Sequence, residues 1–145
     1  MSQVGFVGAG RMGAPMVRRL VETGHHVHAL GRSVEKRRAV SELGAQPATD
    51  LADIGTDADV VIVCVFTDDQ VRQVCVESLL LSTMRPGSSL VIHTTGSPRT
   101  AETVAAEAES RDIAVVDAPV SGGPHDIAAG PVSYTHLTLP TNREV

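Results

Sequence analysis

The sequence predicts an α/β fold in which helices cover both faces of an open, mostly parallel, doubly wound sheet. Short apolar runs alternate with helical patterns of about 10 to 15 residues, which is typical of parallel strands joined by crossover helices. The central run 58–66, ADVVIVCVF, is apolar at nearly every position, as a strand buried on both faces requires. The chain has 145 residues, enough for one domain with a sizeable core, and we expect no second domain.

In the first half of the chain, each predicted strand is a short apolar run and each predicted helix ends at a glycine. Glycine is common after a helix end because it readily takes a positive φ. The third run contains Pro47, which has no N–H for a strand ladder, so we expect only a marginal strand there. The predicted elements are a strand at 4–7, a helix between Gly13 and Gly24, a strand at 25–30, a helix at 34–43 before Gly44, and a strand at 45–48.

The second half continues the same alternation. Its first strand is the strongest of the chain, and apolar residues at helical spacing predict a long helix after it. Pro86 and Gly87 mark a turn before the next strand. The predicted elements are a strand at 58–66, a helix at 68–81 with Val71, Val74, Leu79 and Leu81 as buried candidates, a strand at 89–93, a helix at 99–110 and a strand at 113–116.

Composition and charge narrow the function classes. The net charge of −5 argues against a nucleic-acid surface, and we interpret the basic cluster 36–38 as a solvated helix face. Cys64 and Cys75 have neither the number nor the spacing of a disulfide framework or a zinc site. His26 and His28 would share one strand face, but no third ligand is evident, so we expect no metal. Without a signal peptide or an apolar run of ~20 residues, we expect a cytoplasmic protein with no membrane partner.

A glycine-rich turn, VGFVGAGRMGAPM at 4–16, connects the first strand with the first helix. Its spacing matches the dinucleotide fingerprint, in which Gly8 permits the tight turn, Gly10 lets backbone approach a pyrophosphate, and Gly13 allows close helix–strand packing. The helix N-terminus then offers free N–H groups and a positive dipole end to the phosphates. The pattern alone is weak evidence, but its place between a strand and a helix predicts a Rossmann-type NAD(P)-binding domain.

The end of the second predicted strand bears on the choice between NAD and NADP. An NAD site usually has Asp or Glu there to bind the ribose 2′-hydroxyl, whereas this chain has Gly31, Arg32 and Ser33. Arg32 can pair with a 2′-phosphate and Ser33 can donate a hydrogen bond to it, which favours NADP over NAD. In the alternative interpretation, Ser33 caps the next helix and Arg32 is an exposed neighbour, and the two roles are compatible.

Four motifs of this sequence stand out together. They are GFVGAGRMGAPM at 5–16, GRS at 31–33, the group Thr94, Thr95 and Pro98, and DAPVSGG at 117–123, which is the most specific. Together they resemble the β-hydroxyacid dehydrogenase family, which includes 3-hydroxyisobutyrate dehydrogenase, and the resemblance covers about residues 1–130. It implies a two-domain oxidoreductase that transfers hydride between NADP(H) and a small 3-hydroxy acid or its semialdehyde. It also implies that this chain contains most of the N-terminal half of such a protein and none of the C-terminal half.

The resemblance also implies roles for individual residues. Segment 66–68 would border the nicotinamide, and Thr95 would contact the nicotinamide ribose. Segment 121–123 would anchor the carboxylate of a small substrate through a hydroxyl and exposed backbone N–H groups; alternatively it is only a polar turn. The implied cofactor-binding residues are Gly8, Ala9, Gly10, Arg11, Met12, Gly13, Arg32, Ser33, Phe66, Thr67 and Thr95, and the implied substrate-binding residues are Ser121, Gly122 and Gly123.

Two family features are missing from this sequence. The family's catalytic lysine, with a nearby Asn, lies far downstream beside an all-helical dimerising domain, whereas the single lysine here is Lys36 on the second predicted helix. We therefore expect no catalytic residue in this chain, no activity from it alone, and a homo-oligomeric full-length protein. An imine reductase, in which the lysine is replaced, and a non-catalytic dinucleotide-binding or chromatin-reader module are the alternatives. The residue at the lysine position would distinguish them.

The segment 132–145, VSYTHLTLPTNREV, departs from the pattern of the rest of the chain. It is polar, has no usable periodicity and contains the single tyrosine. It resembles translated vector or adapter sequence, so we interpret 1–131 as an incomplete NAD(P)-binding domain and 132–145 as a non-native tail. A genuine flexible C-terminus is the alternative.

Overall fold

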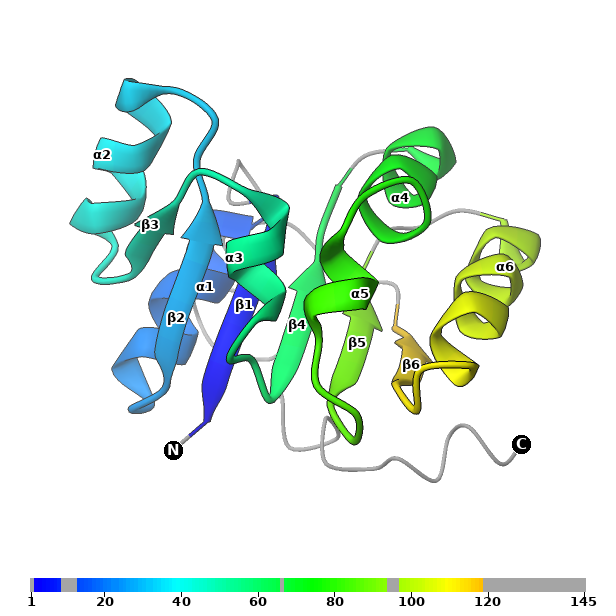
Figure 1. The fold of residues 1–145 in the computed structure, drawn as a ribbon. Coiled ribbons are helices and arrows are strands. Elements are labelled where there is room, and N and C mark those ends of the chain that lie inside the picture. The colour runs from blue at the N-terminus through cyan, green and yellow to red at the C-terminus, as the bar shows by residue number, and fades with distance from the viewer. Residues whose placement is uncertain (1, 9–12, 66, 94–96, 119–145) are drawn as a thin grey trace.

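A computed structural model of the chain describes residues 2–8, 13–65, 67–93 and 97–118 (Figure 1). The strands are β1 (Gln3–Val7), β2 (His26–Leu30), β3 (Gln46–Ala48), β4 (Val60–Val63), β5 (Ser89–Ile92) and β6 (Ala114–Asp117). The helices are α1 (Gly13–Glu22), α2 (Val34–Glu42), α3 (Leu51–Gly55), α4 (Asp68–Cys75), α5 (Leu80–Thr83) and α6 (Pro98–Glu109). All strand pairs are parallel, in the order β3-β2-β1-β4-β5-β6, which confirms the predicted Rossmann-type sheet.

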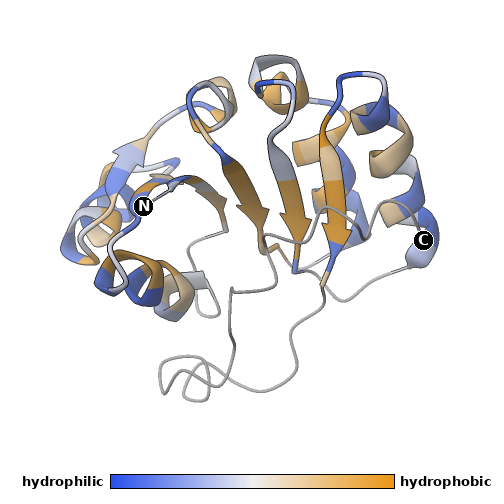
Figure 2. Cartoon of the chain, turned by 90° about the horizontal axis from the view of Figure 1, so that it is seen from below, coloured by the Kyte–Doolittle hydropathy of each residue, from blue (hydrophilic) through white to orange (hydrophobic). Residues whose placement is uncertain are grey.

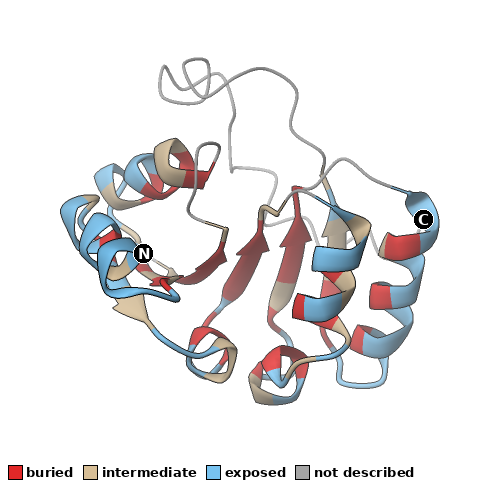
Figure 3. Cartoon of the chain, turned by 90° about the horizontal axis from the view of Figure 1, so that it is seen from above, coloured by how far each residue is buried: buried red, intermediate tan, exposed pale blue. Residues whose placement is uncertain are grey.

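Helices cover both faces of this sheet. α1 and α2 pack on one face, and α3, α4, α5 and α6 pack on the other (Figure 1). Seen from above, the helices carry buried positions toward the sheet and exposed positions away from it (Figure 3). The central strands are apolar along most of their length (Figure 2). Members of the cluster on the α1 side include Phe6, Met16, Val17, Leu20, Val40 and Ile62.

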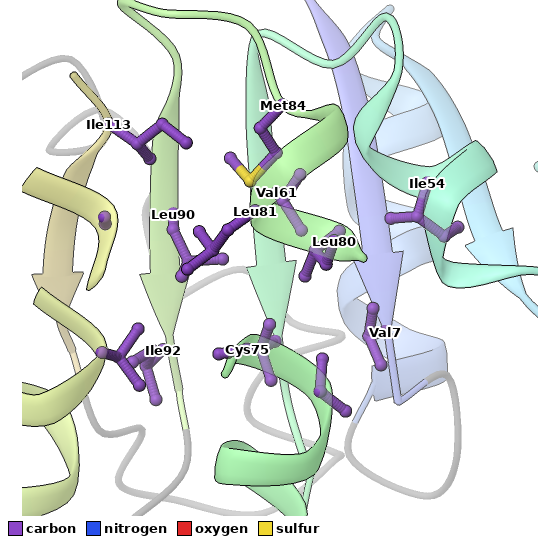
Figure 4. Close-up of a cluster of buried hydrophobic side chains, with 14 of the residues drawn as sticks. Val7, Ile54, Val61, Cys75, Leu80, Leu81, Met84, Leu90, Ile92 and Ile113 are labelled. Atoms are coloured by element: carbon purple, nitrogen blue, oxygen red, sulfur yellow. The ribbon is translucent and has the colours of Figure 1, made fainter. Parts of the chain in front are cut away.

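The larger hydrophobic cluster lies between the central strands and helices α3 to α6 (Figure 4). Leu80 and Leu81 of α5 join Val61 of β4 and Leu90 of β5 in it. Its buried members are aliphatic or sulfur-containing side chains, without an aromatic ring. Burial of each large aliphatic side chain contributes about 1.5 to 3 kcal/mol. The core is therefore built as the scarcity of aromatic residues in the sequence implies.

The predicted strands are all present, with small differences at their ends. β4 is shorter than the predicted run 58–66, and its four residues are all buried, as expected for a central parallel strand. The marginal strand at Pro47 is the three-residue edge strand β3. Gly24 and Gly44 follow α1 and α2 with φ of 97° and 91°, so both predicted glycine stops are confirmed.

The prediction of one helix over 68–81 is wrong, because a short break separates α4 from α5. At this break the Ser78 hydroxyl donates to the Val74 carbonyl and accepts the Leu80 N–H, so it occupies backbone groups that a continuous helix would pair. Leu79, expected to be buried, lies beside Ser78 and is 64% exposed. The other buried candidates, Val71, Val74 and Leu81, are buried.

Helix α3 was not predicted from the sequence, because five residues are too few for an apolar period to be recognised. Asp50 caps its start by accepting the Ala52 N–H at 3.2 Å. The helix lies directly on β1, since a Cβ atom added at Gly5 would come within 2.6 Å of the Ile54 carbonyl oxygen. Gly5 is therefore required by the packing of α3 on the central sheet.

Candidate dinucleotide-binding site

The carboxyl ends of β1 and β4 form the ligand-binding edge expected for this sheet. The chain runs outward from β1 to β2 and β3, then returns to place β4 on the other side of β1. Open α/β sheets bind ligands in the crevice at such a switch point. The predicted cofactor-binding residues that are described lie just beyond strand ends at this edge or open the helix that follows: Gly8, Gly13, Arg32, Ser33 and Thr67.

Gly8 and Gly13 are packed so closely that neither position has room for a side chain. Gly8 has a φ of 103°, and a Cβ atom there would lie 1.9 Å from the carbonyl oxygen of Cys64 beyond β4. A Cβ atom at Gly13 would lie 2.0 Å from the Gly8 carbonyl oxygen and 2.9 Å from the Phe6 ring. The positive φ of Gly8 and the close packing at Gly13 agree with the steric roles predicted for these two glycines, while Gly10 lies outside the described residues. The end of β1 therefore packs directly against the backbone beyond β4 and against the start of α1.

Nine predicted site residues lie outside the described residues, and their roles stay predictions. They belong to the glycine turn, to the segments after β4 and β5, and to the segment after β6. The proposed boundary between the domain and its tail also lies outside the described residues. The nine residues are Ala9, Gly10, Arg11, Met12, Phe66, Thr95, Ser121, Gly122 and Gly123.

The start of α2 is fixed by two contacts at the end of β2. The Ser33 hydroxyl accepts the Lys36 N–H at 3.1 Å, so Ser33 is the helix cap that the alternative interpretation expected. The Arg37 Nη1 atom donates to the Gly31 carbonyl at 3.1 Å. A Cβ atom at Gly31 would lie 2.8 Å from Arg37 Cγ, so the glycine makes room for this arginine.

The interpretation of the basic cluster 36–38 as a solvated helix face holds for Lys36 and Arg38, which are exposed, but not for Arg37. Its side chain is half-buried against Gly31, whereas Arg32 and Lys36 are exposed. Among the described residues, no carboxylate forms an ion pair with Arg32. The structure therefore leaves an exposed guanidinium beside a capped helix start. Sequence analysis missed Arg37, because its contact with Gly31 is visible only once α2 is placed beside the end of β2.

The start of α4 is held by a capping box and by a contact with α6. The Thr67 hydroxyl accepts the Gln70 N–H, and the Gln70 side chain accepts the Thr67 N–H, both at 3.1 Å. The Asp68 carboxylate accepts the Ser97 N–H at 3.1 and 3.2 Å from its two oxygens. Thr67 is a predicted cofactor contact. Its hydroxyl oxygen already accepts a hydrogen bond in the helix cap, but the hydroxyl hydrogen can still be donated to another group.

His93 connects the ends of β5 and β6. Its ring is 8% exposed, and Nδ1 lies 2.5 Å from the Ala118 carbonyl oxygen. Burial lowers the pKa of His93, partly offset by this hydrogen bond, so the ring is neutral at pH 7. Sequence analysis assigned no role to His93. A polar residue at the end of an apolar strand was the available signal.

Other chemistry at this edge is limited in the described part of the chain. Burial raises the pKa of Cys75 to about 12 and also raises the pKa of Cys64, so both are neutral thiols at pH 7. No group of three or more His, Cys, Asp or Glu side chains within the described ranges could hold a metal ion. Among the same residues, no helix combines the length and apolarity needed to cross a bilayer.

Comparison with known proteins identifies the family. Residues 3–136 match the family model described as the NAD-binding domain of 6-phosphogluconate dehydrogenase. An uncharacterized oxidoreductase of Shewanella frigidimarina is 41% identical over 125 residues, which are 85% of this chain and 43% of that protein. The chain spans less than half the length of the curated relatives it matches.

Solved structures share the fold. The 3-hydroxyisobutyrate dehydrogenase of Mycobacterium tuberculosis, solved with L-serine, is 33% identical with a TM-score of 0.82, over 89% of this chain and 44% of that one. An imine reductase from Myxococcus stipitatus, solved with NADP+, is 26% identical with a TM-score of 0.76, over 86% of this chain and 43% of that one. Both candidate enzyme classes are therefore represented among similar structures.

Proposed function

This chain belongs to the family of the NAD-binding domain of 6-phosphogluconate dehydrogenase, and from this membership we propose that it is the NADP-binding part of an oxidoreductase similar to 3-hydroxyisobutyrate dehydrogenase. The reaction proposed for the whole protein is hydride transfer between NADP(H) and a small 3-hydroxy acid or its semialdehyde. The carboxylate substrate, the homo-oligomeric state and the cytoplasmic location are parts of the same proposal.

The packing around Gly8 is the observation that carries this proposal. Gly8 and Gly13 hold the end of β1 and the start of α1 close together at the switch point, an arrangement that fits a group bound at a helix N-terminus. A pyrophosphate meets this description, because unpaired N–H groups at a helix start bind anions. A bound nicotinamide cofactor would supply the hydride, and the residues of this chain would hold its phosphates and riboses.

The preference for NADP rests on Arg32. Its guanidinium is exposed beside the end of β2, next to β1, where the ribose of the adenosine half is held in folds of this kind. The segment 31–33 contains no acidic side chain that would repel a 2′-phosphate. A charge-assisted hydrogen bond contributes about 1.5 to 3 kcal/mol. We therefore expect Arg32 to supply roughly 10- to 100-fold of preference for NADP over NAD.

Titration calorimetry with NADP and NAD at one low salt concentration tests this preference. The parent chain should bind NADP more tightly, and Arg32→Ala should abolish most of the ratio. Ser33→Asp is the second variant, because Asp keeps the cap of α2 while its carboxylate repels a 2′-phosphate. It should retain the parent's thermal stability and lose the preference. Equal affinities of the parent for both cofactors, or an unchanged ratio in Arg32→Ala, would refute the role of Arg32.

An imine reductase is the second candidate function, supported by the similarity to the Myxococcus stipitatus enzyme. Proteins with either function share the N-terminal half of the fold, so an assay of the full-length protein is needed to distinguish the two functions. The full-length protein should be assayed with a cyclic imine and with 3-hydroxyisobutyrate. Turnover of the hydroxy acid supports the first proposal and turnover of the imine the second. Cofactor binding without either activity would support a non-catalytic module.

A further inference from the structure

Arg32 lies in the short link between β2 and α2, and both of its neighbours in the chain are anchored by hydrogen bonds. Before it, the Gly31 N–H donates to the Ala48 carbonyl at 2.8 Å, which joins the end of β2 to the end of β3. After it, the Ser33 hydroxyl accepts the Lys36 N–H and caps α2. Arg32 itself is exposed. The exposed arginine therefore sits at the centre of a link that is held at both ends (Figure 1).

One residue of α2, Arg37, contacts both neighbours of Arg32. Its backbone N–H donates to the Ser33 carbonyl at 2.9 Å, as an ordinary helical hydrogen bond. Its Nη1 atom donates to the Gly31 carbonyl at 3.1 Å. Any residue except proline can make the first bond, whereas the second requires a long side chain with a donor at its end. The bond to Gly31 is therefore the specific contribution of the Arg37 side chain.

Gly31 and Arg37 are packed against each other. A Cβ atom at Gly31 would lie 2.8 Å from Arg37 Cγ and 2.9 Å from the Arg37 backbone nitrogen. Both distances are well below the optimal separation of non-bonded atoms. Gly31 is buried and Arg37 is half-buried, whereas the next residue, Arg38, is exposed. A side chain at position 31 would therefore displace the arginine from the carbonyl to which it donates.

The charge of Arg37 suits a position beside a phosphate site. Among the residues that the structure describes, no carboxylate forms an ion pair with it. Its guanidinium stays protonated, so its bond to the neutral Gly31 carbonyl is charge-assisted and stronger than a bond between neutral groups. The segment 31–33 is thus held by a cation, without a carboxylate partner that would repel a 2′-phosphate.

We propose that Arg37 is a positioning residue that favours NADP over NAD by holding the segment 31–33. By anchoring the carbonyl of Gly31, it restricts the backbone at Arg32, so the guanidinium of Arg32 has less freedom to lose when a 2′-phosphate binds. This inference rests on the proposed function, and within it on the role of Arg32. It assigns Arg37 no contact with the cofactor.

The test measures the ratio of the affinities for NADP and NAD, which differ only in the 2′-phosphate. Titration calorimetry gives both dissociation constants for the full 145-residue chain and its variants. Arg37→Met removes the donor and keeps an unbranched apolar stem with a similar helix propensity. It should lower the ratio roughly three- to ten-fold, which corresponds to the ordering of one long side chain. A general loss of stability would weaken both cofactors alike and leave the ratio unchanged.

Arg38→Met is the matched control. It makes the same substitution and removes the same charge at the next position of α2, where the side chain is exposed. Its ratio should stay within about two-fold of the parent's, because exposed charges are screened by salt.

Gly31→Ala tests the same contact without changing any charge. Its Cβ atom would displace the Arg37 side chain, so this variant should lower the ratio as Arg37→Met does. If Arg37→Met does not fold, Gly31→Ala decides the question alone.

A double-mutant cycle with Arg32→Ala separates positioning from direct contact. If Arg37 acts through Arg32, adding Arg37→Met to Arg32→Ala should change the ratio by less than about two-fold. An equal loss from Arg37→Met in both backgrounds would mean that Arg37 acts on the phosphate independently, which would overturn the positioning role.

The outcomes also separate this inference from the proposed function. A ratio within about two-fold of the parent's in Arg37→Met or in Gly31→Ala overturns the inference and leaves the role of Arg32 intact. A loss that Arg38→Met reproduces has the same meaning. A parent chain that binds NADP and NAD equally well overturns the proposed preference and this inference with it.

Discussion

At the scale of single residues, the junction between β1 and α1 depends on positions where a side chain is sterically impossible. Gly8→Ala would place a Cβ atom 1.9 Å from the Cys64 carbonyl oxygen at a φ of 103°. The positive φ costs about 1 to 3 kcal/mol and overpacking against backbone adds about 1 to 3 more. We expect Gly8→Ala to lower the free energy of unfolding by about 2 to 6 kcal/mol, or to fail to fold.

Gly24→Ala provides the control for this substitution. Gly24 has nearly the same φ, 97°, but a Cβ atom there meets nothing within 4 Å. It should therefore show the conformational cost alone. Urea unfolding followed by circular dichroism gives the free energy of unfolding of both variants. Similar losses in the two variants would mean that Gly8 and Cys64 do not approach as closely as described.

His93 makes the stability of the chain depend on pH. Burial lowers the pKa of this ring in the folded state below its ordinary value of 6.5. As the pH falls through 6.5, His93 becomes protonated in the unfolded chain but stays neutral in the folded chain. The free energy of unfolding therefore decreases toward acidic pH. The slope from this one group is at most about 1.4 kcal/mol per pH unit.

His93→Asn removes this titration and keeps an N–H donor for the Ala118 carbonyl. Free energies of unfolding, measured between about pH 7.5 and 5.5, should decline less steeply in this variant than in the parent. The exposed His26→Asn variant controls for the loss of one histidine. Parallel pH profiles for the parent and His93→Asn would show that His93 binds its proton equally well in both states.

At the scale of elements, the sequence predicts what depends on local pattern and fails where partners are distant. The strands were predictable because buried parallel strands are short apolar runs, and the glycine stops because a positive φ strongly favours glycine. The break at Ser78 was not, because a serine in a helical pattern usually faces solvent. Its competition with the backbone becomes visible only with the surrounding chain in place.

The candidate site also contains residues that local sequence patterns predict and residues that they do not predict. The glycine fingerprint and the Arg32–Ser33 pair could be found from spacing alone, since each works within a few residues of a strand end. Arg37, Asp68 and His93 could not, because their partners lie on other turns, helices or strands. The Asp68 and His93 contacts also depend on the strand order, which the sequence does not state. Ser33 caps helix α2, and it also belongs to the segment 31–33 that we propose binds the 2′-phosphate.

At the scale of the whole molecule, hydrogen exchange tests both the sheet order and the interpretation of the terminal segment. β4 lies between β1 and β5 with both faces covered, so amides at 60–63 should open only with global unfolding and exchange most slowly. β3 is a three-residue edge strand and should exchange fastest among the strands. Residues 133–145 should show no protection if they are a non-native tail. Strong protection across 137–139 would contradict that interpretation, because amides are protected only when they are hydrogen-bonded or buried within a folded unit.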